Sequence, residues 1–360
     1  LDREVEGLPA SEAMGERMRT GQVLTRPELS VLLAYAKRGI KDAVASSDLC
    51  NDPYLLQDLE SYFPAKVTER FRDLIPEHPL RRELTATLLS NDVVNSEGIL
   101  FVSRLTRQTG ADPAEIVAAY RIARDVTGAV DRWEAIEGVF GQVSIDTWSR
   151  LMVTSDRAVA AVTRWFLARR NGSTIGETIA KYRPGFAVIE AHAFEVGPNE
   201  WRINRSEAIG RLVDQHVGED LARRHAALPV VVYGADVIDV AAVFDRGIQE
   251  TLDVFLRIGR ALGLDRLTDL TRRVVPATRW QRWALWTVEE ELLATRRRAA
   301  ERVLELAGDR PGKDAVNHFL DVRAGHVGRL DRFMSSFDSI PDGDVSPLIV
   351  ALRQIRASLS

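Results

Sequence analysis

The chain has 360 residues, of which 45% are hydrophobic and 28% are charged, and its formal net charge at pH 7 is −4. This balance is typical of a globular protein with a sizeable core, and the near-neutral charge argues against a general nucleic-acid or membrane-surface binder, because both need an excess of basic residues. A single cysteine, Cys50, excludes an internal disulfide and any metal site built on several cysteines.

The first segment, "LDREVEGLPASEAMGERM", carries charges of both signs from its start and lacks the apolar core of a secretory signal. It begins at Leu1 rather than Met, and we expect the chain to be part of a longer polypeptide. We predict that residues 1–24 form a connecting helix from an upstream domain. No apolar run reaches the roughly 18 residues of a membrane span. We expect a cytoplasmic protein, since a single cysteine fits a reducing compartment.

The next segment, "LTRPELSVLLAYAKRGI", has the pattern of a helix start followed by an amphipathic helix. Thr25 and Glu28 form a capping box, in which each side chain accepts a hydrogen bond from the other residue's backbone N–H. Pro27 lies in the first turn, where its missing N–H leaves no helical hydrogen bond unmade. An apolar stripe follows at helical spacing, formed by Leu29, Leu32, Leu33, Ala36 and Ile40.

The same pattern of caps, apolar stripes and terminal Pro or Gly recurs downstream, and it predicts helices over nearly the whole chain. In the second half we predict helices over about 205–225, 236–262, 278–307, 313–338 and 346–357, with a turn before them at 197–204. Only "LPVVVYG" (228–234) has the β-branched composition of a strand. Because it has no partner strand, we interpret it as an extended connector.

The prediction is therefore an all-α fold, an irregular multi-helix bundle with no nucleotide-binding sheet. We divide it into a first helical bundle over residues 25–196 and a second bundle with long antiparallel helices over residues 197–360. One continuous helical domain is the alternative.

No catalytic, cofactor-binding or metal site is predicted in this chain. None of the six histidines lies at metal-binding spacing, and we interpret them as ordinary surface or core residues. The run "NDVVNSEGI" (91–99) starts like a magnesium-binding motif of all-α cyclases, but Asn95 and Ile99 stand where the ligands Ser and Glu belong. The sequence has no glycine-rich phosphate loop and no nucleophile elbow.

Two features of the second half are candidate interfaces. Trp280, Trp283 and Trp286 lie three residues apart on one helical flank, where buried aromatic packing and a contact with another chain or domain are the two interpretations. In "EEELLATRRRA" (289–299), three acids precede three arginines. We interpret this charge band as a solvated, charge-complementary helix face rather than an anion site.

The first 140 or so residues resemble a known family. The segments "LTRPELSVLLAYAK", "DPYLLQDLESYFP", "ERFRDLIPEHPLRRELTATLLSNDVVNSEGILF" and "TGADPAEIVAAYRIAR" resemble, in order and spacing, the C-terminal helical region of the large bacterial NAD-specific glutamate dehydrogenases. The segment "MGERMRTGQVLTRPEL" is similar to the corresponding segment of actinobacterial members of the family. One departure is Ser96, which stands where the family often has Arg.

The resemblance implies a non-catalytic domain of an enzyme of amino-acid catabolism. The full-length enzyme would oxidatively deaminate L-glutamate to 2-oxoglutarate and ammonium with NAD, both bound in an upstream catalytic core. This fragment would bind no NAD and would act in scaffolding, homo-oligomer contacts or regulation. A stand-alone helical adaptor is the alternative, and an all-α enzyme with its own pocket is a third hypothesis.

Four polar residues in the segment that matches the family best are candidate structural or interface residues. They are Arg82, Glu83, Asn91 and Asn95, which lie along a mostly apolar predicted helix. We expect them to tie helices together or to meet the catalytic core; ordinary caps and surface groups are the alternative.

Overall fold

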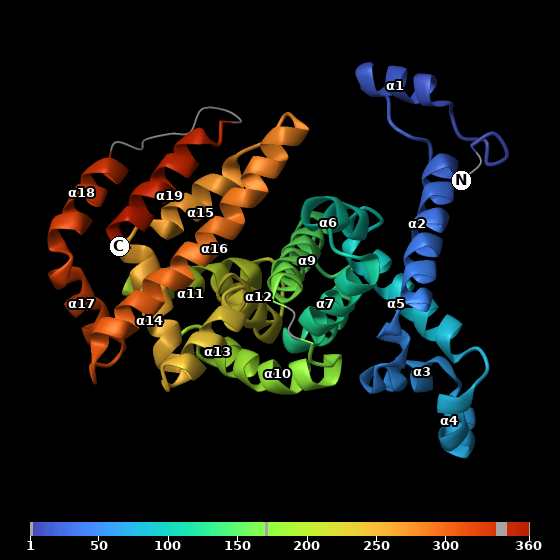
Figure 1. Cartoon of the computed structure of the whole chain (residues 1–360), viewed down its shortest axis with the longest axis horizontal. Helices are drawn as coiled ribbons and strands as arrows, with labels where there is room; N and C mark the ends of the chain where they lie inside the picture. Colours follow the sequence, from blue (N-terminus) through green and yellow to red (C-terminus); the bar gives the residue numbers. More distant parts are fainter. Residues whose placement is uncertain (1–2, 170–171, 336–343, 360) are drawn as a thin grey trace. The chain divides into compact units, whose positions relative to one another are not determined.

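The computed structural model describes residues 3–169, 172–335 and 344–359, and every regular element in these ranges is helical, which confirms the all-α prediction (Figure 1). The α-helices of the first half are α1 Ser11–Arg19, α2 Arg26–Ser46, α3 Leu56–Tyr62, α4 Ala65–Phe71, α5 Arg81–Glu97, α6 Phe101–Thr109, α7 Pro113–Val126, α8 Ala129–Gly138 and α9 Ile145–Ala168. Short 3-10 helices are η1 Asp48–Asn51, η2 Pro53–Leu55 and η3 Arg72–Glu77.

The second half contains ten α-helices within the described ranges. They are α10 Ile175–His192, α11 Asn199–Asp214, α12 Glu219–Val231, α13 Gly234–Val243, α14 Ile248–Ala261, α15 Leu264–Arg273, α16 Arg279–Ala307, α17 Gly312–Val322, α18 Ala324–Ser335 and α19 Ser346–Leu359.

The helices pack into two compact units that alternate along the chain. The first unit comprises Leu1–Asp125 and Val159–Ala180, and the second comprises Val126–Ala158 and Lys181–Ser360. This grouping does not test where independently folding domains begin, so the two bundles over 25–196 and 197–360 stay a prediction. Within the predicted connecting segment 1–24, α1 is the only helix in the described residues 3–24.

In the first unit, α2 begins with the predicted capping box. The Glu28 carboxylate accepts a hydrogen bond from the Thr25 backbone N–H at 2.7 Å, and the Thr25 hydroxyl accepts one from the Glu28 N–H at 3.5 Å. The C-terminal half of α2 packs against α5, where Ile40 and Val44 are buried. Helix α7 is buried on nearly all sides from Ile116 to Ala123, and this buried stretch includes the charged residue Arg121.

In the second unit, the long helix α16 lies at the centre of the packing. It contacts α13, α14, α15, α17 and α19, and its buried face includes Val288, Ala299, Ala300, Val303 and Ala307. Small residues on this face let the neighbouring helices approach closely. A smaller apolar cluster elsewhere in the same unit consists of Ile136, Leu151, Val217, Leu221 and Ala222.

Five local predictions are wrong. The predicted helix 205–225 covers parts of two helices, α11 and α12, because His216 adopts φ 66° between them. The predicted helix 313–338 is divided at Arg323 into α17 and α18, and its last residues, 336–338, lie outside the described residues. Residues 228–231 are not an extended connector but the last turn of α12, where Leu228, Val230 and Val231 are buried, and this burial outweighs the β-strand propensity of the two valines. The predicted helix 236–262 is two helices, because Asp245 adopts φ 51° between them. The predicted turn over 197–204 is limited to its first residues, since α11 already begins at Asn199.

In the described ranges, no single helix is both long enough and apolar enough for a membrane span. The one candidate is the pair α12 and α13, which passes by length and composition only when the two helices are joined across a 59° bend.

Helices α14 and α16 meet where a glycine faces a buried arginine. The Arg296 side chain is 2% exposed, donates a hydrogen bond to the Phe255 carbonyl at 3.1 Å and another to the Asp265 carboxylate, and lies over the Tyr233 ring. A Cβ atom at Gly259 would lie 1.7 Å from Nη1 of Arg296. Only glycine at position 259 leaves room for this guanidinium.

We therefore predict that Gly259→Ala lowers the free energy of unfolding by about 3 kcal/mol, because the new methyl group must displace a buried, hydrogen-bonded arginine. Urea denaturation would measure the change. The matched control is Gly210→Ala in α11, where a Cβ meets no atom within 4 Å. For this control we expect the free energy of unfolding to rise by about 0.5–1 kcal/mol, from helix propensity alone. Equal effects at the two positions would contradict the prediction.

Candidate functional site

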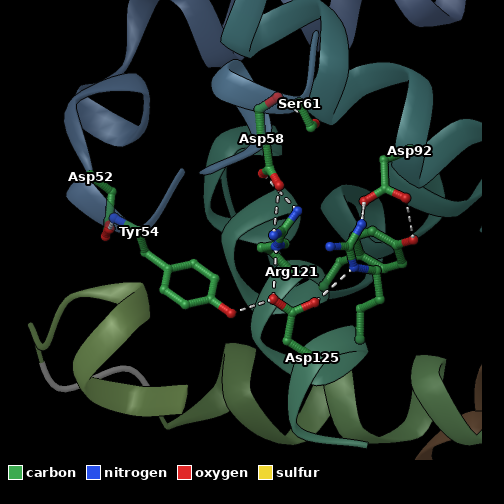
Figure 2. Close-up of polar contacts among 9 residues, drawn as sticks. Asp52, Tyr54, Asp58, Ser61, Asp92, Arg121 and Asp125 are labelled. Carbon is green, nitrogen blue, oxygen red and sulfur yellow. Dashed lines mark hydrogen bonds and ion pairs between the residues drawn. The ribbon is translucent and has the colours of Figure 1, made fainter. Parts of the chain in front are cut away.

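A network of charged side chains lies buried in the first unit (Figure 2). Its centre is Arg121 on α7, which is 4% exposed. Asp125 comes from the same helix, Asp58 from α3 and Asp92 from α5. Isolated charges are strongly disfavoured in a protein interior, so each of these groups needs partners of opposite charge.

Arg121 connects α7 to α3. Its Nη2 donates a hydrogen bond to Oδ1 of Asp58 at 2.9 Å, and its Nη1 lies 2.7 Å from Oδ2 of the same carboxylate. Its Nε donates to Oδ2 of Asp125 at 3.1 Å, one turn further along α7. The guanidinium also lies over the ring of Tyr54, 5.6 Å from its centroid. The planar donor fork of arginine suits this combination of carboxylates and an aromatic face.

Arg124 connects α7 to α5 in the same way. It donates to Asp92 at 2.6 Å and to the other oxygen of Asp125 at 2.9 Å. The Tyr120 hydroxyl donates to Asp92 at 3.3 Å. Thus one face of α7 presents a row of polar groups to two other helices of the unit.

The pKa values of these groups follow from burial and from their neighbours. Burial raises the pKa of Asp58 and of Asp92, although Arg121 and Arg124 oppose the shift. Burial and the Asp92 carboxylate raise the pKa of Tyr120, which keeps its hydroxyl a proton donor. For Arg124, burial lowers the pKa but the carboxylates of Asp92 and Asp125 outweigh it, and the net pKa is raised.

Asp52 and Tyr54 extend the network to a segment far away in the sequence. The Tyr54 hydroxyl donates to Asp125 at 2.7 Å (Figure 2). Asp52 accepts hydrogen bonds from the backbone N–H of Tyr54 and from that of Ile175, both at 2.9 Å. Asp52 therefore caps η2 and also the first turn of α10.

The charged groups of this network are paired with one another. Its carboxylates are occupied by arginines and tyrosines, and no nucleophile–base pair lies among the residues of Figure 2. Over the described residues, no group of three or more His, Cys, Asp or Glu side chains is arranged to hold a metal ion. What the arrangement does is fix the positions of α3, α5 and α7 relative to one another.

Arg82, predicted as a residue that ties helices together, lies at the start of α5 and reaches the end of α2. Its guanidinium donates hydrogen bonds to the backbone carbonyls of Ala45 and Ser47. The last carbonyls of a helix have no intrahelical partner, so a cation in this place both satisfies them and complements the helix dipole.

The other three polar candidates of α5 are Glu83, Asn91 and Asn95. Asn95 is exposed and accepts a hydrogen bond from Nζ of Lys37 on α2 at 2.9 Å. Glu83 is exposed and Asn91 is half-buried. Their predicted interface role stays a prediction.

The three tryptophans on the flank of α16 differ in exposure. Trp280 is 67% exposed, whereas Trp283 and Trp286 are partly buried. Trp280 and Trp283 pack edge to face at 5.4 Å, and the Arg279 guanidinium lies over both rings. The indole N–H of Trp286 is buried without a hydrogen-bond acceptor among the described residues.

The charge band "EEELLATRRRA" is not simply a solvated face. Arg296 is buried, and Arg297 forms ion pairs with Asp236 at 2.9 Å and with Glu301 at 2.8 Å. The interpretation as a solvated face is therefore wrong for Arg296, because three consecutive positions of a helix span 200° and at least one of them must turn towards the packed side.

A second buried cluster lies around Arg132 of α8 in the second unit. Arg132 is fully buried and donates to the Ser155 hydroxyl at 3.0 Å and to the Thr127 carbonyl at 3.1 Å. Burial lowers its pKa to about 10. Nearby, burial raises the pKa of Asp156 to about 6, although the Trp133 N–H donates to it at 3.0 Å. Burial and the charge of Arg132 lower the pKa of His225 to about 4.

Sequence reasoning missed both clusters, although one signal was available. Arg121 and Asp125 are spaced i, i+4 in "EIVAAYRIARDV", a stretch whose other positions are largely apolar. Ionic residues on the buried side of such a helix must pair with each other or with a neighbour. The partners on α3 and α5 carry no comparable signal.

The family described as "Glutamate dehydrogenase, C-terminal" matches residues 21–357. Among curated proteins, the NAD-specific glutamate dehydrogenases of Halomonas elongata and Pseudomonas aeruginosa are 32% and 33% identical over 360 and 357 residues, and that of Mycobacterium tuberculosis is 27% identical over 365. Each alignment covers 99% of this chain but only 22% of the relative.

For the network of Figure 2, we predict that Arg121→Ala lowers the free energy of unfolding by about 3–5 kcal/mol, because it leaves the Asp58 and Asp125 carboxylates buried without their shared cation. Chemical denaturation gives the value. The control is Arg38→Ala, which removes a 72% exposed arginine 3.8 Å from Asp42. It should change stability by less than about 0.5 kcal/mol. A loss of similar size in both variants would show that the buried network has no special role.

The cluster around Arg132 predicts two opposite pH effects. The raised pKa of Asp156 means that the folded chain keeps a proton that the unfolded chain releases, so its contribution to stability is lost as pH rises from about 4 through about 6. The lowered pKa of His225 means the reverse, so its contribution is lost as pH falls from 6.5 through about 4. In the native chain the two contributions oppose each other.

Single variants should separate these two effects. At pH 7 the free energy of unfolding of Asp156→Asn should exceed that of the native chain by about 2 kcal/mol, and at pH 4 the two values should be equal. For His225→Gln, the free energy of unfolding at pH 4 should exceed the value of the same variant at pH 7 by a similar amount. Denaturation curves of the three proteins between pH 4 and 7 measure this. A native-to-variant difference that does not change with pH would refute the assignment.

Proposed function

The chain belongs to the glutamate dehydrogenase C-terminal family, and from this premise we propose that it is the non-catalytic C-terminal helical domain of an NAD-specific glutamate dehydrogenase. One observation carries the proposal: the alignment with relatives of that name covers 99% of this chain and only 22% of theirs. The segments that resemble the family in the first 140 residues fall within the matched range. An actinobacterial source, suggested by the sequence of residues 14–29, is the narrower form of the proposal.

In this proposal, the full-length protein oxidatively deaminates L-glutamate in the cytoplasm. A hydride passes from glutamate Cα to NAD, and water converts the resulting imine into 2-oxoglutarate and ammonium. L-glutamate and NAD bind in the catalytic core that precedes this chain. The residues described here touch neither of them.

The role of the helical domain in this proposal is mechanical. Its charged side chains are used to join helices, as Arg121 does for α3 and α7 and as Arg82 does for α2 and α5. Helices held in this way form a firm support for scaffolding, for contacts between the subunits of a homo-oligomer, or for transmitting an effector's binding to the core. The exposed Trp280, packed with Arg279 and Trp283, is a candidate for such a contact.

The same aromatic surface favours the alternative of a stand-alone helical adaptor, since tryptophan and arginine are enriched at interface hot spots. The two hypotheses differ in one simple observation. The native open reading frame extends upstream of Leu1 into a glycine-rich dehydrogenase core in the first case and does not in the second.

The experiment that tests the proposal is a calorimetric NAD titration of the full-length protein and of residues 1–360 alone. We expect the full-length protein to bind NAD and to oxidise L-glutamate, and the isolated chain to give no heat of binding up to millimolar NAD. Circular dichroism of the same sample checks that the isolated chain is helical. Micromolar NAD binding to residues 1–360 alone would overturn the assignment of a non-catalytic domain.

A further inference from the structure

Helix α2 carries one continuous apolar stripe, and only half of it is covered. Leu29, Leu33, Ile40 and Val44 follow one another at spacings of four, seven and four residues, which places them on one face of the helix. Ile40 is 7% exposed and Val44 is fully buried, but Leu29 is 44% and Leu33 is 37% exposed. We call Leu29 and Leu33 the open stripe.

The stripe changes from buried to open because α5 pairs with only part of α2. The start of α5 lies at the end of α2, where Arg82 binds the carbonyls of Ala45 and Ser47. The end of α5 lies near the middle of α2, where Asn95 binds Lys37. Since α5 ends at Glu97, the eleven residues of α2 before Lys37 continue roughly 16 Å beyond this pairing.

The open part of α2 is nevertheless a well-formed helix. The capping box of Thr25 and Glu28 closes its first turn. Arg17 of α1 forms an ion pair with Glu28 at 2.9 Å, and the Tyr35 hydroxyl donates to Glu6 at 2.5 Å. Exposed leucines on a helix with a fixed conformation form a preformed binding surface. Leucines at the fraying end of a helix would not form one.

The N-terminal segment does not cover the stripe. Arg17 and Glu6 of this segment contact Glu28 and Tyr35 of α2, which are seven residues apart and lie on a different face from Leu33 and Ile40. Figure 1 shows α1 at the upper end of α2. Val23, just before the cap, adds a further side chain that is 85% exposed.

We propose that the open stripe is the docking surface for the part of the same polypeptide that precedes this chain. The inference rests on the proposed function, in which that part is the catalytic core. The relatives are between four and five times as long as the matched region, so most of their length lies outside it. In this proposal the two parts are joined through the N-terminal segment, which contacts the same stretch of α2 at Glu28 and Tyr35.

The size of the surface favours a tethered occupant over a separate chain. The exposed apolar area of Leu29, Leu33 and Val23 is on the order of a few hundred Å², whereas a stable interface between separate proteins buries about 1,200–2,000 Å². A short tether raises the effective concentration of the partner to about the millimolar range, so a small apolar contact is enough. The other occupant to be tested is a second copy of this chain.

The test is a photo-crosslink in the full-length protein, with p-benzoylphenylalanine in place of Leu33. We expect irradiation to link position 33 to a peptide that precedes residue 1, in a product of monomer size, as mass spectrometry of the digest would show. The matched control places the probe at Leu306 of α16, which is 39% exposed, and should not yield that peptide. A dimer-sized product, a link only within residues 1–360, or no link at all would overturn the proposal.

A second measurement uses variants that keep the helix. In Leu29→Ser/Leu33→Ser, trypsin should cleave the full-length protein at Arg17 and Arg19 about ten times faster than in the native protein. Arg17 is paired with the same stretch of α2, so α1 should open more often when that stretch loses its contact with the core. Leu306→Ser, with the same chemical change on α16, should stay within about twofold. Equal rates in the double variant and the control would contradict the proposal. Micromolar NAD binding to residues 1–360 alone would instead overturn the proposed function, and the crosslinking and proteolysis results could still be interpreted separately.

Discussion

Buried arginine is the constraint on which much of this fold depends. Arg121, Arg132, Arg205 and Arg296 are each at most 5% exposed. In an all-helical interior most backbone carbonyls are already used by the helices, so a buried guanidinium has to find carboxylates, hydroxyls or carbonyls near helix ends. Arg121 uses two carboxylates, Arg132 a hydroxyl and the Thr127 carbonyl, and Arg205 the carbonyls of Trp201 and Val196. Each solution fixes where two or more elements meet.

The sequence predicted the elements that depend on local chemistry. The capping box of Thr25 and Glu28 and the long helix α16 are found as expected, because caps and apolar periodicity act within a few residues. The sequence did not predict which charges are buried. Arg296 belongs to a run of three arginines, and its burial depends on the missing side chain of Gly259, 37 residues away. Residues 228–231 were missed for a related reason, since tertiary packing overrode β-branched propensity.

In the candidate site, too, the sequence predicted some roles of the polar residues and not others. Arg82 is a polar residue on a mostly apolar helix, and that pattern alone indicated an interhelical role, which its contacts with the end of α2 illustrate. Which of Asn91, Asn95 and Glu83 would have partners was not visible in the sequence, because the answer depends on where α2 crosses α5. The chain belongs to a family whose named relatives are enzymes, and the polar clusters described within its helices join those helices to one another.

The hydrogen bond between Asp52 and the N–H of Ile175 has a consequence for biosynthesis. It closes the first unit across 123 residues, and the intervening chain contains Val126–Ala158, which belongs to the other unit. A ribosome adds about 5–20 residues per second, so the partner of Asp52 emerges roughly 6–25 s after it. During that interval the first unit lacks Val159–Ala180 and exposes apolar surface that these residues later cover. The first unit can therefore complete its packing only after Ile175 has emerged.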